Sequence, residues 1–196
     1  MNSLRVGIVD TGIDTPLSHG SEIAALLRAG HSGLELLAAD VFPERGRCSP
    51  AQIAAALDRL VDAGARLVNM SLGTRRAEAQ LRAACERAAA AGVLLVASAP
   101  ARGAPVYPAA YAQCIAVSGD ARCGEDEISW LDGGNADFGA HPFFIPGDAS
   151  RGGASYAAAR VAGRIAALLA TGTPAADVVA ALRAHCRYHG PERRLA

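Results

Sequence analysis

Along this chain, short apolar runs alternate with stretches in which apolar residues recur every three or four positions. Apolar runs of about four to eight residues are typical of strands buried on both faces, and the longer spacing is typical of amphipathic helices. The runs that predict strands lie at residues 4–9, 34–41, 66–70, 93–97 and 114–118. Helical spacing covers residues 20–29, 50–63, 77–91, 155–170 and 174–185.

One helix start is marked more clearly than the others. Ser49 stands at the N-cap position, Pro50 follows at the first helical position, and Gln52 completes a capping box. Gly64 is placed to end this helix. The pattern loosens after residue 119, where residues 128–131 and 142–145 predict two further short strands.

Repeated strand–helix–strand units with continuously apolar strands predict an α/β fold. We expect a three-layer, doubly wound sandwich in which helices cover both faces of a mainly parallel sheet. The length of 196 residues predicts one domain, over residues 1–190, with residues 191–196 as a frayed tail. In such sheets, functional groups collect where the strands reach their carboxyl ends.

The composition excludes several classes of binding partner. The 19 Lys and Arg residues balance 19 Asp and Glu residues, so no basic surface for nucleic acid is predicted. No uncharged apolar run reaches the roughly 18 residues of a membrane-spanning helix, and no secretory signal is visible, so a cytoplasmic protein is expected. The apolar fraction of 51% and the short loops are compatible with a homodimer.

The chain has five cysteines, at positions 48, 85, 114, 123 and 186. Their number is odd and no pair has C-x-x-C spacing, which predicts reduced thiols rather than a disulfide scaffold or a zinc site. Residues 125–127 are acidic and adjacent, and we interpret them as a solvated turn rather than a calcium site. No metal and no cofactor is therefore expected.

Three polar residues carry the candidate chemistry. Asp10 directly follows the first strand, His19 opens the first helix, and Ser155 lies at the start of the long apolar helix. A serine there faces free backbone N–H groups and the positive end of the helix dipole. Taken singly, Asp10 could be a turn residue, His19 a helix cap and Ser155 an N-cap. Together they form the acid, base and nucleophile set of acyl transfer.

The order of these segments resembles that of the subtilisin-like serine proteases, or subtilases, from about residue 4 to residue 170. The similar segments are VGIVDTGID (6–14), HGSEIA (19–24), VNMSLG (68–73), the stretch 107–117, and GASYAAARVAG (153–163).

The resemblance implies a role for each of these residues. Ser155 would be the nucleophile, His19 the general base, and Asp10 the group that orients the imidazole. Ser71, Leu72 and Gly73 would pair with an extended substrate backbone as an added strand does. A strand end followed by a turn is the alternative interpretation of that triplet.

Two departures from the family pattern concern the oxyanion site. Ala101 stands where the family has an Asn that donates to the developing oxyanion, and no Asn occurs between residues 93 and 114. The family's Thr before the nucleophile is Ala154 here. The backbone N–H of Ser155 remains as a donor, and the side chains of Arg102 and Asn135 are speculative further donors. Loss of one such donor typically costs about 10²–10³ in rate.

Three hypotheses follow. The first is an intracellular serine endopeptidase that cleaves a peptide or protein substrate, weakened by the missing Asn and suited to processing a specific peptide. The second is a catalytically impaired subtilase-fold protein that binds peptides or serves as an accessory module. The third, a retroviral-type aspartic protease built on Asp10-Thr11-Gly12, requires an all-β chain, which the alternation of helices and strands contradicts.

Overall fold

The computed structural model describes residues 3–42 and 47–192. The predicted frayed tail falls partly outside these ranges, from residue 193 on, and stays a prediction. The strands described are β1 (Leu4–Asp10), β2 (Leu34–Asp40), β3 (Leu67–Met70), β4 (Leu94–Ser98), β5 (Cys114–Gly119), β6 (Ile128–Gly133), β7 (Ala136–Ala140) and β8 (Tyr188–His189). The α-helices described are α1 (His19–Gly30), α2 (Pro50–Asp62), α3 (Ala79–Ala90), α4 (Ala154–Ala170) and α5 (Val178–Ala184).

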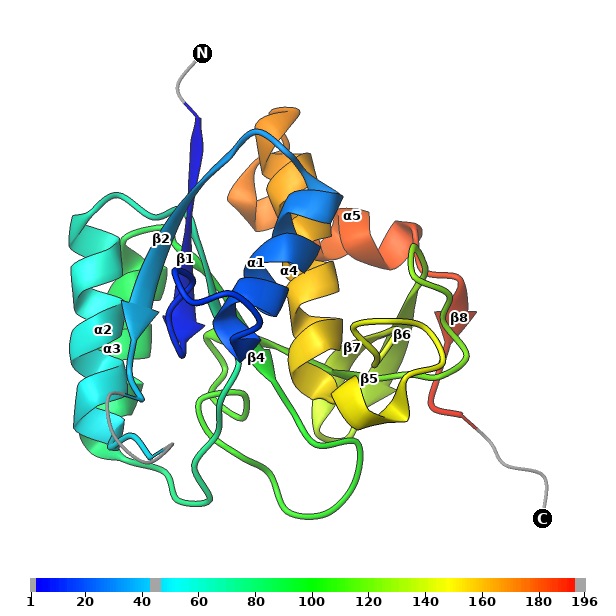
Figure 1. The fold of residues 1–196 in the computed structure, drawn as a ribbon, viewed down its shortest axis with the longest axis horizontal. Helices are drawn as coiled ribbons and strands as arrows, with labels where there is room; N and C mark the ends of the chain where they lie inside the picture. Colours follow the sequence, from blue (N-terminus) through cyan, green and yellow to red (C-terminus); the bar gives the residue numbers. More distant parts are fainter. Residues whose placement is uncertain (1–2, 43–46, 193–196) are drawn as a thin grey trace.

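The described strands form one sheet in the order β2-β1-β3-β4-β5-β7-β6-β8. The six strands from β2 to β7 in this order are mutually parallel, while β6 pairs antiparallel with β7 and carries β8 on its other side. Helices α2 and α3 lie side by side on one side of the sheet, and α1 and α4 lie side by side on the other (Figure 1). The predicted α/β fold class is confirmed.

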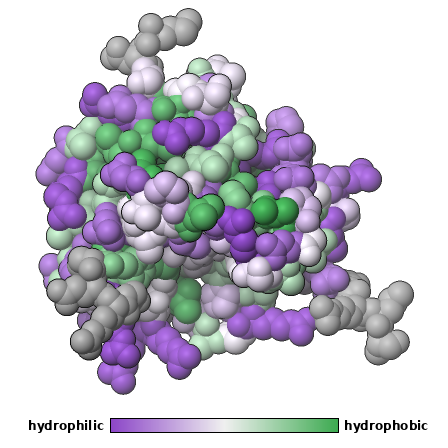
Figure 2. Space-filling view, viewed as in Figure 1, coloured by the Kyte–Doolittle hydropathy of each residue, from purple (hydrophilic) through white to green (hydrophobic). Residues whose placement is uncertain are grey.

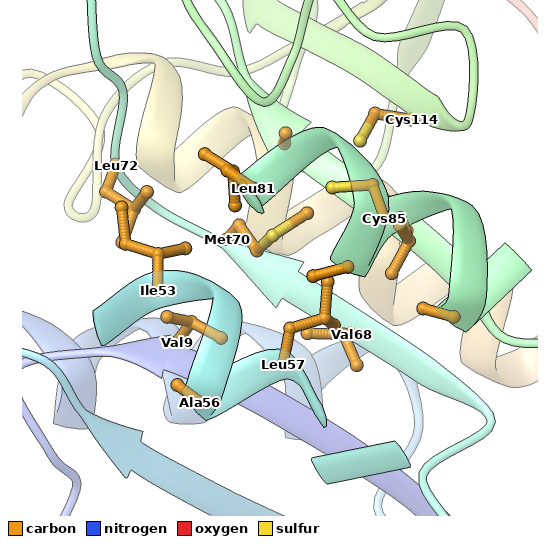
Figure 3. Packing of buried hydrophobic residues seen from close by; sticks show 14 of the residues in the cluster. Val9, Ile53, Ala56, Leu57, Val68, Met70, Leu72, Leu81, Cys85 and Cys114 are labelled. Carbon is orange, nitrogen blue, oxygen red and sulfur yellow. The ribbon is translucent and has the colours of Figure 1, made fainter. Parts of the chain in front are cut away.

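The layer between the sheet and α2/α3 is built from the apolar stripes of these two helices. The predicted capping box is present, with Ser49 Oγ accepting from Gln52 N–H and the Gln52 side chain accepting from Ser49 N–H. From that start, α2 buries Ile53 and Leu57 against Met70 of β3 (Figure 3). Burial of this apolar surface, at about 25 cal/mol per Å², holds the layer together.

The opposite layer brings α1 and α4 very close together. Val6 and Ile8 of β1 point into this layer, whereas Val9 points into the other, as the alternation of a strand requires. The two helices approach at Gly30 and Gly163. A Cβ on Gly30 would lie 2.5 Å from the backbone of Gly163, so side chains at this crossing would separate the helices.

The loosely patterned region after residue 119 departs from the prediction. Residues 142–145 form no strand and contribute only an isolated bridge between Phe143 and Gly152. The strand next to β5 is instead β7, whose sequence ADFGA has no apolar run. The predicted last helix is a short 3₁₀ turn, Ala175–Asp177, followed by the seven residues of α5.

In the described part of the chain, no helix is both long and apolar enough to cross a membrane. Hydrophilic side chains surround most of the outline of the molecule, with hydrophobic ones between them in the upper half of the view (Figure 2). This distribution is what amphipathic covering helices leave on the outside.

Candidate active site

Asp10 and His19 are hydrogen-bonded at the carboxyl end of β1. The Nδ1–H group of His19 faces both carboxylate oxygens of Asp10, at 2.8 Å from Oδ2 and 2.9 Å from Oδ1. Asp10 is buried, with 1% of its surface exposed, and it also accepts from the backbone N–H of Thr11 at 2.6 Å. The structure thus brings together the first two residues of the predicted set, nine positions apart in sequence.

Backbone packing fixes the start of α1 next to the end of β1. Ser18 caps α1 by accepting from Ser21 N–H, and Gly20 N–H donates to Thr11 Oγ1 at 3.0 Å. A Cβ on Gly20 would lie 2.0 Å from the carbonyl oxygen of Gly12. Only glycine allows this approach, so the His-Gly pair is needed to place the imidazole against Asp10.

The environment of His19 favours its charged form. The hydrogen bond to Asp10 is the largest influence and raises the pKa of His19 above its usual value of 6.5, against the opposing effect of burial. Because a carboxylate can only accept, the proton of neutral His19 lies on Nδ1. Nε2 then carries a lone pair that can accept a proton from a hydroxyl.

Ser155 lies in the first turn of α4. The N-cap residue, Gly153, has no side chain, so no side-chain cap occupies the free N–H groups of this helix start. Gly153 N–H donates to the carbonyl oxygen of Pro142 at 2.8 Å, which anchors the turn before the helix. The backbone N–H of Tyr156 donates to Gly153 O at 3.2 Å, whereas those of Ala154 and Ser155 have no backbone partner among the described residues and are available to an anion.

Tyr156, the residue after Ser155, contacts the ring of His19. The rings of Tyr156 and His19 have centroids 5.4 Å apart, which places the start of α4 against the start of α1. The hydroxyl of Ser155 makes no hydrogen bond with any residue of the described ranges 3–42 and 47–192. Catalytic hydrogen bonds are often long without substrate and tighten once it binds.

The predicted substrate-binding segment directly follows β3. Asn69 Nδ2 donates to Ser71 Oγ at 2.9 Å, which fixes the side chain of Ser71. Leu72 and Gly73 have no backbone hydrogen-bond partner within the described part of the chain. Such free N–H and C=O groups are what an added strand requires.

The three proposed oxyanion donors differ in their surroundings. The backbone N–H of Ser155 is at the open helix start described above. The amide of Asn135 donates to Gly103 O at 3.0 Å, so this side chain ties the β6–β7 turn to the loop after β4. Arg102 is exposed. A pocket of about 540 Å³ lies between these loops and includes Ala101 and Pro142 in its lining.

A polar network beside His19 was not predicted. Tyr156 Oη donates to Glu22 Oε2 at 2.6 Å, and Arg151 forms an ion pair with the same carboxylate. The guanidinium of Arg151 lies 4.5 Å from the ring centroid of Phe144. The sequence feature that indicates this network is Glu22, which lies three residues after His19 on the apolar face of α1.

Comparison with known families identifies one match. Residues 13–138 match the sequence profile of the subtilase family, which is nearly two thirds of the 196 residues. The matched segment contains His19 and the 71–73 triplet, and it begins after Asp10 and ends before Ser155. No curated protein sequence shows significant similarity to the chain.

Solved structures share the fold at low identity. The structure of prenylagaramide maturation protease PagA has a TM-score of 0.65 and 21% identity, covering 86% of this chain and 75% of that one. A lanthipeptide protease has a TM-score of 0.69 and 15% identity, covering 93% and 80%. A cold-adapted subtilisin-like serine proteinase has a TM-score of 0.71 and 18% identity, covering 92% and 81%.

Proposed function

This chain belongs to the subtilase family, and we propose that it is a serine endopeptidase that cleaves peptide bonds through Asp10, His19 and Ser155. The observation that carries the proposal is the hydrogen bond from half-buried His19 to buried Asp10, beside the open helix start that holds Ser155. Family membership supports the serine-protease class of the reaction.

The proposed reaction has two proton transfers in each half. His19 Nε2 takes the proton of the Ser155 hydroxyl as its oxygen attacks the substrate carbonyl carbon, and Asp10 stabilises the resulting imidazolium. The carbonyl electrons become an oxyanion near the N–H groups at the start of α4. Collapse expels the amine, which takes the proton from Nε2 and leaves an acyl-enzyme. Water, deprotonated by His19 Nε2, then attacks the acyl carbon. Collapse of this second intermediate releases the acid, and Nε2 returns the proton to the Ser155 oxygen.

We further propose that the enzyme is slow and processes a specific peptide. Ala101 cannot donate the hydrogen bond that the family Asn would supply, which removes about 10²–10³ in rate. A low rate is tolerable when one peptide is the substrate. Two proteins of the same fold are described as a maturation protease and a lanthipeptide protease, in line with this idea. The five free thiols fit a reducing, cytoplasmic setting.

Labelling with a fluorophosphonate tests the proposal without knowledge of the substrate. The probe should phosphonylate wild-type protein at Ser155, as located by peptide mass spectrometry, and should leave Ser155→Ala unlabelled. Ser150, which precedes the turn into α4, provides a matched control, because Ser150→Ala should label as wild type does.

A second candidate function is peptide binding without cleavage. The alanine at position 101 and the Ser155 hydroxyl, which is not hydrogen-bonded to His19, are the observations that favour it. Absence of labelling in protein shown by circular dichroism to be folded would contradict the protease and support this alternative.

A further inference from the structure

The Glu22 carboxylate lies where the helix carrying His19 meets the helix carrying Ser155. Glu22 is three residues after His19 and lies on the same face of α1. It is 8% exposed, and Tyr156, whose hydroxyl it accepts at 2.6 Å, is 6% exposed. A charged group so deeply buried is retained only where it is paired.

The partners of Glu22 come from both sides of Ser155 in the sequence. Arg151 precedes Ser155 in the 3₁₀ turn Ala149–Arg151, and Tyr156 follows it in α4. The Phe144 ring packs on both partners, at 4.5 Å from the Arg151 guanidinium and 5.9 Å from the Tyr156 ring. One carboxylate of α1 therefore holds the segment before the proposed nucleophile and the residue after it.

We propose that Glu22 is a positioning residue that, through Tyr156 and Arg151, sets the distance between Ser155 and His19. This inference rests on the proposed protease function. The Asp10–His19 bond fixes the imidazole relative to β1, and the Glu22 network fixes α4 relative to α1. A misplacement of about 1 Å between reacting groups costs on the order of 10² in rate, so the network acts on catalysis without touching the substrate.

The charged and titratable groups around His19 also predict an effect of this network on the pH dependence of catalysis. Asp10 faces the imidazole from β1, Glu22 from α1 and Tyr156 from α4, with Arg151 paired to Glu22. The negative charge of Glu22 adds to the effect of Asp10 in raising the pKa of His19. Loss of this charge should therefore move the acid limb of a pH profile to lower pH.

The test uses the full chain and the rate of fluorophosphonate labelling at Ser155 as a function of pH. Glu22→Gln and Tyr156→Phe should each lower the plateau rate by about 10- to 100-fold. Glu22→Gln should also shift the acid limb downward. The double variant should label no more slowly than the slower single variant, because both changes act on the same contact between Glu22 and Tyr156.

Tyr111→Phe is the matched control for loss of a buried phenol. Tyr111 is 4% exposed, and its hydroxyl bonds the backbone of Glu78 on the other side of the sheet. This variant should melt at a temperature close to that of Tyr156→Phe and label within about twofold of wild type. Equal slowing of both phenylalanine variants would overturn the inference as a general effect of stability.

The failures of the two proposals give different results. Wild type that labels, with Glu22→Gln and Tyr156→Phe labelling within about twofold of it, overturns the positioning role and leaves the protease intact. Folded wild type that does not label overturns both.

Discussion

His19 owes its properties to a carboxylate that is almost completely buried. Asp10 holds Nδ1 and raises the pKa of His19, and a protonated imidazole cannot accept the Ser155 proton. Labelling should therefore fall as the pH drops through a midpoint above 6.5, the ordinary pKa of His19. The measurement is the labelling rate between about pH 5 and pH 9, and a midpoint below 6.5 would contradict it.

Removing the charge at position 10 should act on both rate and pH profile. Asp10→Asn leaves the backbone in place but permits the wrong imidazole tautomer, and a change of this kind costs about 10⁴ in kcat in a related triad. The acid limb should also move to lower pH, since the largest cause of the raised His19 pKa is lost. Labelling kinetics of the variant check both effects, and an unchanged rate would show that Asp10 has no catalytic role.

The missing oxyanion donor can be restored in one step. Ala101→Asn places an amide where the family has one and should raise kcat by up to about 10²-fold with little change in KM. The assay is turnover of a chromogenic peptide library by both proteins. Ala99→Asn, two residues earlier at a buried position, should bring no gain. An unchanged kcat in Ala101→Asn would mean that another group already stabilises the oxyanion.

At the scale of elements, the crossing of α1 and α4 tolerates no side chain. Gly30→Ala would place a Cβ 2.5 Å from the Gly163 backbone, and overpacking of this kind costs about 1–3 kcal/mol. Urea unfolding measures the loss. Gly124→Ala is the control, because its Cβ would have no contact closer than 3.6 Å. Equal stability of the two variants would show that the helices can separate freely.

Most elements could be predicted because their local signals agree with the tertiary structure. The capping box at Ser49 predicted the start of α2, and the apolar runs predicted the five parallel strands β1 to β5. β7 was missed because its sequence has a Gly and an Asp, and the side chain of Asp137 is used to accept from Ala116 N–H of β5. The apolar run at 142–145 packs as a loop instead.

Local sequence signals also explain which residues of the site could be predicted. Asp10 and His19 each stand at the junction of an element with a turn, and such positions are visible in a sequence. The Glu22 network was not visible, because its partners are more than 100 positions away and a lone Glu on a helix is ordinarily solvated. The link of Asn135 to the loop after β4 was likewise hidden in tertiary contacts.

Over the whole molecule, all five cysteines are free thiols. Cys48 and Cys186 are half-buried, whereas the other three are buried, and burial raises the pKa of Cys123 to about 11. A thiol reagent should therefore modify Cys48 and Cys186 first in the native protein and all five in denaturant. Mass spectrometry at successive times measures the order in which the cysteines are modified. Early modification of Cys123 would contradict its burial in the core.

The contact between Gly20 and the Gly12 carbonyl has a consequence for the order in which the site is completed. It joins acid and base within the first twenty residues, so that pair can form while synthesis continues, whereas residue 155 emerges more than 130 residues later. In the proposed protease, a nascent chain that ends at residue 150 therefore holds the proton acceptor His19 but lacks the nucleophile Ser155. A protease that completes its site in this order is unable to cut itself or its neighbours until α4 has docked.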